Sequence, residues 1–183
     1  MSKQALLVID MQNDFFVDDE LERCREDLTK ACNALIDKAR EAGVPVLDVQ
    51  TVHKHDKSTW ALNMLEDDQG MSLEGSEGVQ RVDGLQPGDV VIPKTRDSAF
   101  FDTGLEQRLR EAGVERLVLC GVSTESCIAA TATDAYARDL RVTLVEDGTA
   151  SIEWAQHDQT LARLKEQYRQ AVVSAADVDF SNP

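Results

Sequence analysis

The chain has 183 residues, of which 42% are apolar and 29% charged, and this composition is typical of a folded globular protein rather than a disordered one. Its length predicts a single domain over residues 1–183. The formal net charge of −15 at pH 7 argues against nucleic acid or an anionic membrane surface as a partner.

The N-terminal residues and the cysteines favour a cytoplasmic protein. Met1 leads within a few residues into an apolar run at 5–9, which is too short for a signal peptide or a membrane span. No two of the four cysteines form a Cys-x-x-Cys pair or have the spacing of a metal finger. We therefore expect reduced thiols in a cytosol.

The first half of the chain predicts two strands separated by a helix. Residues 5–9 form a continuous apolar run that stops at Asp10, which is typical of a strand covered on both faces. Asp19 is expected to cap a helix whose apolar residues, including Cys24 and Cys32 on its core face, recur at helical spacing. The second strand is expected at residues 44–49.

A long segment without clear periodicity follows, at residues 53–88, with one helical turn expected at residues 60–65. Connections of this length are uncommon in compact domains and often form lids or binding loops. Trp60 lies in this segment, and large apolar side chains of this kind need a surface to pack against. We interpret the segment as a binding loop rather than a loose surface insertion.

The second half predicts further alternation of strands and helices. A third strand at residues 90–92 is followed at once by Lys94, and a capping-box pattern at Thr103 opens a helix. A fourth apolar run ends at Gly121, after which Thr124 is expected to cap an alanine-rich helix. The remaining elements are expected as a strand at 142–145, a helix at 152–167, a weak strand at 171–173 and a disordered tail at 179–183.

Cys127 falls in the first turn of the alanine-rich helix. Unpaired N–H groups and the helix dipole favour an anion there, so the pKa of the thiol is expected to be lowered. The same N–H groups are suited to hold the oxyanion of a tetrahedral intermediate. The alternative is a buried, inert cysteine, because free cysteine is among the most buried residue types.

Reactive residue types follow three of the predicted strands. Strands that alternate with helices imply a parallel sheet in a three-layer α/β sandwich, whose ligands bind outside the carboxyl ends of the strands. Asp10 follows the first strand, Lys94 the third and Cys127 the fourth. Asp10 is the candidate base for the thiol, and Lys94 the candidate cation for its thiolate. A Cys–His pair is the weaker alternative, because His53 and His55 are the only histidines near a strand end.

Three stretches of the sequence resemble the motifs of the isochorismatase-like cysteine hydrolases, in the order found in that family. They are Leu7 to Phe15, Pro93 to Phe100 and Gly121 to Cys127. The resemblance implies a three-layer α/β/α sandwich whose central six-stranded parallel sheet has the Rossmann-like strand order 3-2-1-4-5-6. It also implies a homodimer or a higher homo-oligomer.

The same resemblance implies a catalytic triad of Cys127, Asp10 and Lys94. It implies a cis peptide bond between Val122 and Ser123, with the N–H groups of Ser123 and Cys127 as the oxyanion hole. The expected reaction is hydrolysis of an amide, ureido or lactam-type C–N bond through a thioester on Cys127. The alternatives are an isochorismatase-type vinyl-ether hydrolase, which does not need the cysteine, and a non-catalytic member of the family that binds a metabolite.

One departure from the family pattern concerns a metal. The nicotinamidases of this family carry an Asp-x-His metal motif after the second strand, and here the matching positions are Thr51, Val52 and His53. His53 and His55 without a placed third ligand are weak evidence for zinc. We therefore expect no metal and no other cofactor, and nicotinamide becomes a less favoured substrate.

The residues that select the small-molecule substrate are expected among the aromatic side chains near the motifs. Phe15 belongs to the first motif, Trp60 to the segment at 53–88 and Phe100 to the lysine motif. These three side chains are the candidate substrate-binding residues. The identity of the substrate does not follow from the sequence.

Overall fold

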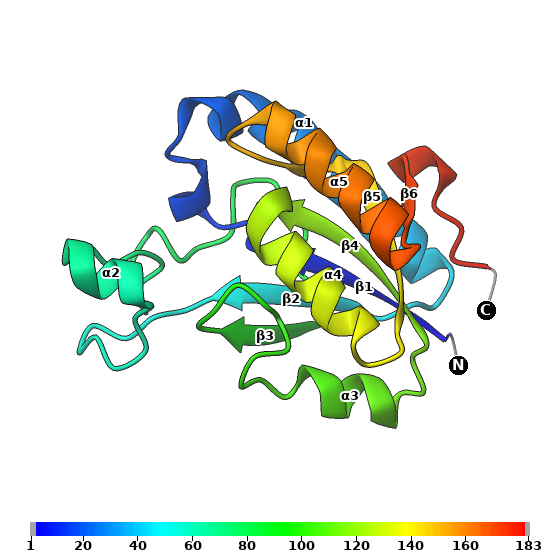
Figure 1. The fold of residues 1–183 in the computed structure, drawn as a ribbon, viewed down its shortest axis with the longest axis horizontal. Helices are drawn as coiled ribbons and strands as arrows, with labels where there is room; N and C mark the ends of the chain where they lie inside the picture. Colours follow the sequence, from blue (N-terminus) through cyan, green and yellow to red (C-terminus); the bar gives the residue numbers. More distant parts are fainter. Residues whose placement is uncertain (1–2, 182–183) are drawn as a thin grey trace.

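The computed structural model describes residues 3–181. Its sheet has six strands, every neighbouring pair of which is parallel, in the order β3-β2-β1-β4-β5-β6 (Figure 1). This confirms the predicted sandwich and its strand order. The strands are β1 (Gln4–Ile9), β2 (Val46–Thr51), β3 (Val90–Lys94), β4 (Arg116–Val122), β5 (Arg141–Ala150) and β6 (Ala171–Val173).

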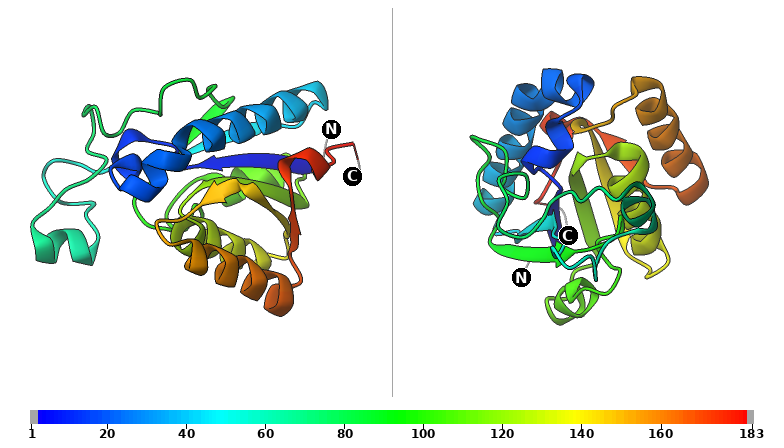
Figure 2. Two further views of the ribbon diagram at one scale, coloured as in Figure 1. Left: turned by 90° about the horizontal axis from the view of Figure 1, so that it is seen from above. Right: turned by 90° about the vertical axis from the view of Figure 1, so that its left-hand side faces the viewer.

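Helices cover both faces of the sheet (Figure 2). Alternate residues of β1 divide between two core clusters, Leu6 and Val8 with α1 and Leu7 and Ile9 with the helices of the other face. This alternation is the two-residue period of a strand that is buried on both sides. The first face carries α1 (Asp19–Glu41), and the second carries α3 (Leu105–Glu111), α4 (Ala129–Tyr136) and α5 (Trp154–Tyr168).

The remaining elements are the helix α2 and several short turns. The helix α2 (Leu62–Asp67) lies in the long segment between β2 and β3 and projects from the body of the molecule, beyond the end toward which the strand arrows point (Figure 1). The turns are η1 (Asn13–Phe16), η2 (Thr124–Ile128) and η3 (Ala175–Asp177). Among residues 3–181, no helix is long and apolar enough to cross a membrane.

Several local expectations need correction. The helix α1 is capped by Asp18, not Asp19, because the Asp18 side chain accepts a hydrogen bond from the Glu20 N–H at 2.9 Å. The strand β5 continues to Ala150, well past the apolar run at 142–145. The tail is ordered as far as the description reaches, since Phe180 is 7% exposed within the core cluster on the α1 side. The last two residues of the predicted disordered tail, 182–183, lie outside the described residues.

Gly121 brings the end of β4 against the end of β1. It has a φ of +114°, and a Cβ atom at this position would lie 2.0 Å from the carbonyl oxygen of Ile9. Any other residue would push the two strands apart, so glycine is required for the close approach. The residues that follow β1 and β4 are thereby held side by side at the C-terminal edge of the sheet.

Candidate active site

The structure brings together the three reactive residues that the sequence predicts at strand ends. Asp10 follows β1, Lys94 is the last residue of β3, and Cys127 lies in the turn η2 that leads from β4 into α4. The side chains are almost completely buried, with exposed fractions of 0% for Asp10, 2% for Lys94 and 5% for Cys127. Two buried ionisable side chains beside a thiol thus form a charged cluster.

The ammonium group of Lys94 is the centre of this cluster. Its Nζ lies 2.7 Å from Asp10 Oδ2, 3.4 Å from Cys127 Sγ, and 3.1 Å from the carbonyl oxygen of Arg96. It also donates to the hydroxyl of Thr51 at 2.8 Å. An ammonium has three protons, and here it faces four acceptors. The lysine is therefore a donor in every contact, and the sulfur and the carboxylate compete for it.

Thr51 connects Lys94 to Asp10, a role that the sequence pattern did not predict. It ends β2 and lies opposite Lys94 in the register with β3. Its hydroxyl accepts from Lys94 and donates to Asp10 Oδ1 at 2.8 Å, and its N–H donates to the same oxygen at 3.0 Å. Gln12 closes the arrangement, since its Oε1 accepts from the Thr51 N–H at 2.8 Å and its Nε2 donates to the Thr51 carbonyl. One oxygen of Asp10 is thus held by two donors, while Oδ2 faces the ammonium.

The electrostatics differ from the expectation of a reactive thiolate. Burial raises the pKa of the Cys127 thiol well above its usual value, and the negative charge of Asp10 raises it further, against the opposing charge of Lys94. Burial works to lower the pKa of Lys94, but Asp10 and Cys127 outweigh it, so the net shift is upward. The cluster therefore holds a neutral thiol beside a protonated lysine. The lowered pKa expected from the start of a helix is wrong, because burial and a neighbouring carboxylate are stronger here.

The backbone around Cys127 offers donors for an anion. The peptide bond between Val122 and Ser123 is cis, as the resemblance implied. The Ser123 carbonyl accepts from the N–H groups of Ser126 and Ile128 at 3.2 and 3.1 Å, whereas its own N–H has no hydrogen-bond acceptor within residues 3–181. A free N–H close to a nucleophile is the kind of group that stabilises a developing oxyanion.

The turn η2 is anchored from outside the helix that it precedes. Thr124 does not cap α4 as expected; Ile128 occupies the cap position of α4, and Ser123 that of η2. The Thr124 hydroxyl donates to the carbonyl of Ala150 at 3.1 Å and contacts Nδ1 of His157 at 2.8 Å. Because the hydroxyl has one proton, His157 is the donor in the second contact. The buried side chain of His157, on α5, thereby fixes the loop that carries the nucleophile.

The predicted substrate-binding residues do not gather at one place. Phe15 is half-buried and packs against the core on the α1 side. Phe100 is 5% exposed within the core of the other face, where the Arg138 guanidinium covers its ring at 4.6 Å, beyond the C-terminal end of α4. Phe100 therefore belongs to the core cluster that also contains Cys127, on the opposite face of the sheet from Phe15.

Trp60 is tied to the strand that carries the lysine. Its indole N–H donates to the Lys54 carbonyl at 2.9 Å, which buries the ring within the segment at 53–88. The guanidinium of Arg96, two residues after Lys94, donates to the carbonyl of Trp60 at 3.3 Å and to that of Thr59 at 2.9 Å. The long segment is thus fastened to the C-terminal edge of the sheet by backbone contacts.

The residues at the family's metal positions do not fit a bound metal. The Thr51 hydroxyl is engaged by the charged cluster, and His53, whose Nδ1 contacts the Thr59 carbonyl at 2.9 Å, offers only Nε2 as a ligand. His55 Nε2 contacts the Glu74 carbonyl at 2.9 Å. No group of three or more His, Cys, Asp or Glu side chains within residues 3–181 is arranged to hold an ion.

The other cysteines belong to the core on the α1 side. Cys32 and Cys120 are fully buried, and Cys24 is partly buried against the same cluster. This agrees with their interpretation as structural residues. A hydrogen bond with Cys32, together with burial, raises the pKa of Cys120 well above the usual value of a thiol.

Comparisons with a family model, with sequences and with solved structures all indicate the same protein family. The family model of the isochorismatase domain matches residues 4–177. A protein of Arabidopsis thaliana named "Probable inactive nicotinamidase" is 35% identical over 173 residues, covering 88% of this chain and 87% of that protein. An isochorismatase family protein from Desulfovibrio vulgaris superposes with a TM-score of 0.85 at 30% identity, covering 96% of each chain. N-carbamoylsarcosine amidase from Thermoplasma acidophilum gives 0.81 at 28% identity, covering 98% of this chain and 99% of that one.

Proposed function

The chain belongs to the isochorismatase family of hydrolases, and we propose that it hydrolyses the C–N bond of a small amide, ureido compound or lactam through a thioester on Cys127. The observation that carries the proposal is the buried contact between Lys94, Asp10 and Cys127. A buried ion pair beside a thiol costs desolvation energy that a purely structural core does not require. Groups of this kind are typical of functional sites.

The first step is attack of the sulfur on a carbonyl-type carbon. The thiol is neutral before substrate binds, because its pKa is raised, so a base has to remove its proton during the attack. Asp10 takes the proton on Oδ2, the oxygen that is not held by Thr51. As Asp10 becomes neutral, the ammonium of Lys94 is released toward the sulfur, where it favours the charged form.

The tetrahedral intermediate places a negative charge on the former carbonyl oxygen. The N–H groups of Ser123 and Cys127 stabilise that charge by donating hydrogen bonds to the oxygen. Protonated Asp10 then gives its proton to the leaving nitrogen, the C–N bond breaks, and an acyl thioester remains on Cys127. Asp10 next takes a proton from a water molecule that attacks the thioester. It returns this proton to the thiolate of Cys127 as the acid product leaves.

Two comparisons bear on the substrate. A structural relative carries the name of an amidase, which favours a C–N bond over the vinyl ether of isochorismate. Thr51 at the position of a metal-binding carboxylate argues against nicotinamide, although the names of the sequence relatives include both a nicotinamidase and a probable inactive one. We therefore expect a small substrate that needs no metal to activate its carbonyl.

The proposal is tested with a panel of small amides, ureas and lactams, scored for release of ammonia or amine. Rapid quenching and intact mass measurement should trap an acyl adduct on Cys127 with any substrate of the panel that turns over. Isochorismate, assayed in parallel, tests the ether-hydrolase alternative. Turnover of isochorismate by Cys127→Ala at the wild-type rate, with no amide cleaved, would overturn the proposal.

A further inference from the structure

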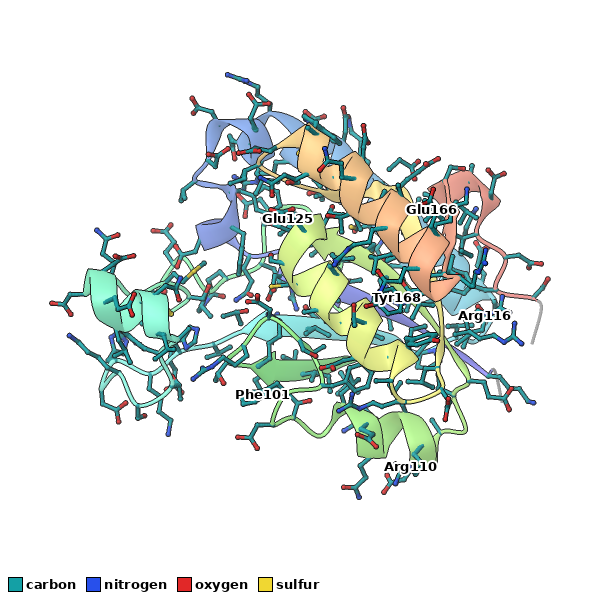
Figure 3. All side chains as sticks on the ribbon, in the orientation of Figure 1. Phe101, Arg110, Arg116, Glu125, Glu166 and Tyr168 are labelled. Atoms are coloured by element: carbon teal, nitrogen blue, oxygen red, sulfur yellow. The ribbon has the colours of Figure 1, made fainter. Side chains whose placement is uncertain are left out.

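A hollow in the surface lies at the edge of the sheet opposite Cys127. It has a volume of about 640 Å³ and is formed where α4 and α5 end and where β4, β5 and β6 begin. Figure 3 places Tyr168 and Arg116 at this end of the molecule, whereas Glu125, in the nucleophile turn, lies near the other end of α4. We call it the arginine hollow; its charged and aromatic lining residues are Arg116, Arg141, Arg169, Asp139, Tyr136 and Tyr168, and Gln170 also lines it.

The arginines of this hollow have no anionic partner. Neither Arg116, Arg141 nor Arg169 forms an ion pair or a side-chain hydrogen bond with any residue of the described part of the chain. Nearby Arg138, by contrast, pairs with Glu106 at 2.9 Å. Asp139 also lines the cavity, so three unpaired guanidinium groups stand against one carboxylate there, which leaves a local excess of positive charge in a chain of net charge −15. Guanidinium groups recognise carboxylates and phosphates through paired hydrogen bonds.

The dipoles of the adjacent helices account for one of these arginines. Arg169 caps the C-terminal end of α5, where a cation is stabilised by the partial negative charge of the helix end. Arg116 and Arg141 are the first residues of β4 and β5, and strands have only small net dipoles. Their convergence on the same hollow therefore calls for another explanation.

Two tyrosines form the aromatic wall of the hollow. The rings of Tyr136 and Tyr168 meet edge to face, with their centroids 5.1 Å apart. Tyr136 is 52% exposed, so a large part of its surface is open to a ligand. An exposed aromatic surface next to unpaired guanidinium groups is suited to a molecule that is flat at one end and anionic at the other.

Gln170 also lines the hollow and carries a buried polar atom without a hydrogen-bond partner among the described residues. Its side chain is 5% exposed, and its Nε2 donates to the Ala132 carbonyl at 2.8 Å, which fixes the orientation of the amide. The Oε1 atom of the same amide is buried and has no hydrogen-bond partner within residues 3–181. A buried acceptor without a donor is costly, and because Oε1 is closed off from solvent it is not a contact point for a ligand in the hollow.

We propose that the arginine hollow binds a small anion that carries a flat ring, a class that includes mononucleotides. The acidic group pairs with Arg116 and Arg141, and the ring lies against Tyr136. The site is separate from the active site, because the hollow is at the N-terminal ends of the strands and Cys127 is beyond the C-terminal end of β4.

Calorimetric titration of the full chain with adenosine monophosphate tests the proposal. We expect saturable binding, with adenosine and inorganic phosphate each at least about tenfold weaker, because each lacks one half of the recognition. Arg141→Gln should weaken binding of adenosine monophosphate by about tenfold or more. The matched control is Arg108→Gln, which removes an unpaired arginine on α3 outside the hollow and should leave binding unchanged.

Several outcomes would overturn the proposal. They are absence of binding to the wild-type protein, equal binding by Arg141→Gln, or adenosine bound as tightly as its phosphate. Inorganic phosphate bound as tightly as the nucleotide would remove the aromatic part of the site. If Arg141→Gln lowers the melting temperature, Arg116→Gln provides the second variant, since it removes another guanidinium from the same cavity.

Discussion

The two edges of the sheet use charge in opposite ways. At the C-terminal edge, Asp10 and Lys94 are buried and in contact with each other, with Thr51 bridging them. At the N-terminal edge, Arg116 and Arg141 are accessible and have no partner among the described residues. A buried charge without a partner is costly, so the first set is held in one geometry; accessible charges cost little, so the second set is available to a ligand. The predictions below test the first half of this comparison.

The largest effect is expected from removal of the nucleophile. Cys127→Ala should lower turnover of the true substrate by about a thousandfold or more, as loss of a triad nucleophile does in other hydrolases. The fold should be retained, because the deleted sulfur atom is small. Steady-state kinetics with the substrate found in the amide panel, together with a melting curve, provides the measurement.

Cys120→Ala is the matched control for this change. It removes a thiol that is equally buried but lies in β4 among the core residues on the α1 side. Turnover should remain at the wild-type level, with a destabilisation of about 1 kcal/mol from the small cavity. Loss of activity in Cys120→Ala but not in Cys127→Ala would show that the nucleophile is assigned to the wrong cysteine.

The next largest effect is expected from Asp10→Asn, which should change the reactivity of the Cys127 thiol and the rate of turnover in opposite directions. Asp10→Asn removes the negative charge that raises the pKa of Cys127 but leaves the ammonium of Lys94 in place. The pKa of the thiol should therefore fall, and iodoacetamide should alkylate Cys127 faster at neutral pH than in the wild-type protein. Turnover should nevertheless be nearly abolished, because an amide cannot accept the proton. Peptide mass mapping after alkylation and the turnover assay measure the two quantities on one sample.

Lys94→Met should shift the pKa of Cys127 in the opposite direction. Loss of the cation should raise the pKa of Cys127 still further and slow its alkylation, since Lys94 is the group that opposes Asp10. A melting curve checks that the variant is folded, because it leaves the carboxylate of Asp10 without its ion pair. Equal alkylation rates in the two variants would contradict the electrostatic account of the site.

The position of these groups could be predicted from the sequence, but their protonation could not. Asp10, Lys94 and Cys127 each follow an apolar run, and parallel strands bring such positions to one edge. The pKa of Cys127 depends instead on how far the side chain is buried and on its distance from a carboxylate of another strand. Neither quantity is encoded in the local pattern, so the rule for helix N-termini gave the wrong direction.

Long-range contacts explain the remaining differences. The capping role expected of Thr124 is displaced by its bonds to Ala150 and His157, which are remote in sequence. Phe180 follows a polar tail segment, yet it completes the core on the α1 side. The ring of Phe100 is drawn into the core by α3 and α4 and covered by Arg138. In each case a tertiary partner decides the outcome, and its identity is not written near the residue.

A smaller effect is expected from Thr51. Thr51→Val keeps the shape of the side chain but removes the hydroxyl that bridges Asp10 and Lys94, so kcat should fall by about 10- to 100-fold, the worth of one hydrogen bond to a charged group. Thr51→Ser restores the hydroxyl and should recover most of the activity. If the valine variant is as active as the wild type, or the serine variant as poor as valine, the hydroxyl has no part in positioning the base.

The smallest expected effect is that of metal removal, which should leave turnover unchanged. A metal ion would add a further buried charge to the C-terminal edge, and a bound ion needs deprotonated, unoccupied ligands. The Thr51 hydroxyl is already engaged by two partners, and His53 offers a single free ring nitrogen, Nε2, because its Nδ1 contacts the carbonyl of Thr59. Extended dialysis against a chelator, followed by assay with and without added zinc, decides the matter: activity that is lost and then restored by zinc would show that His53 and His55 acquire further ligands when substrate is present.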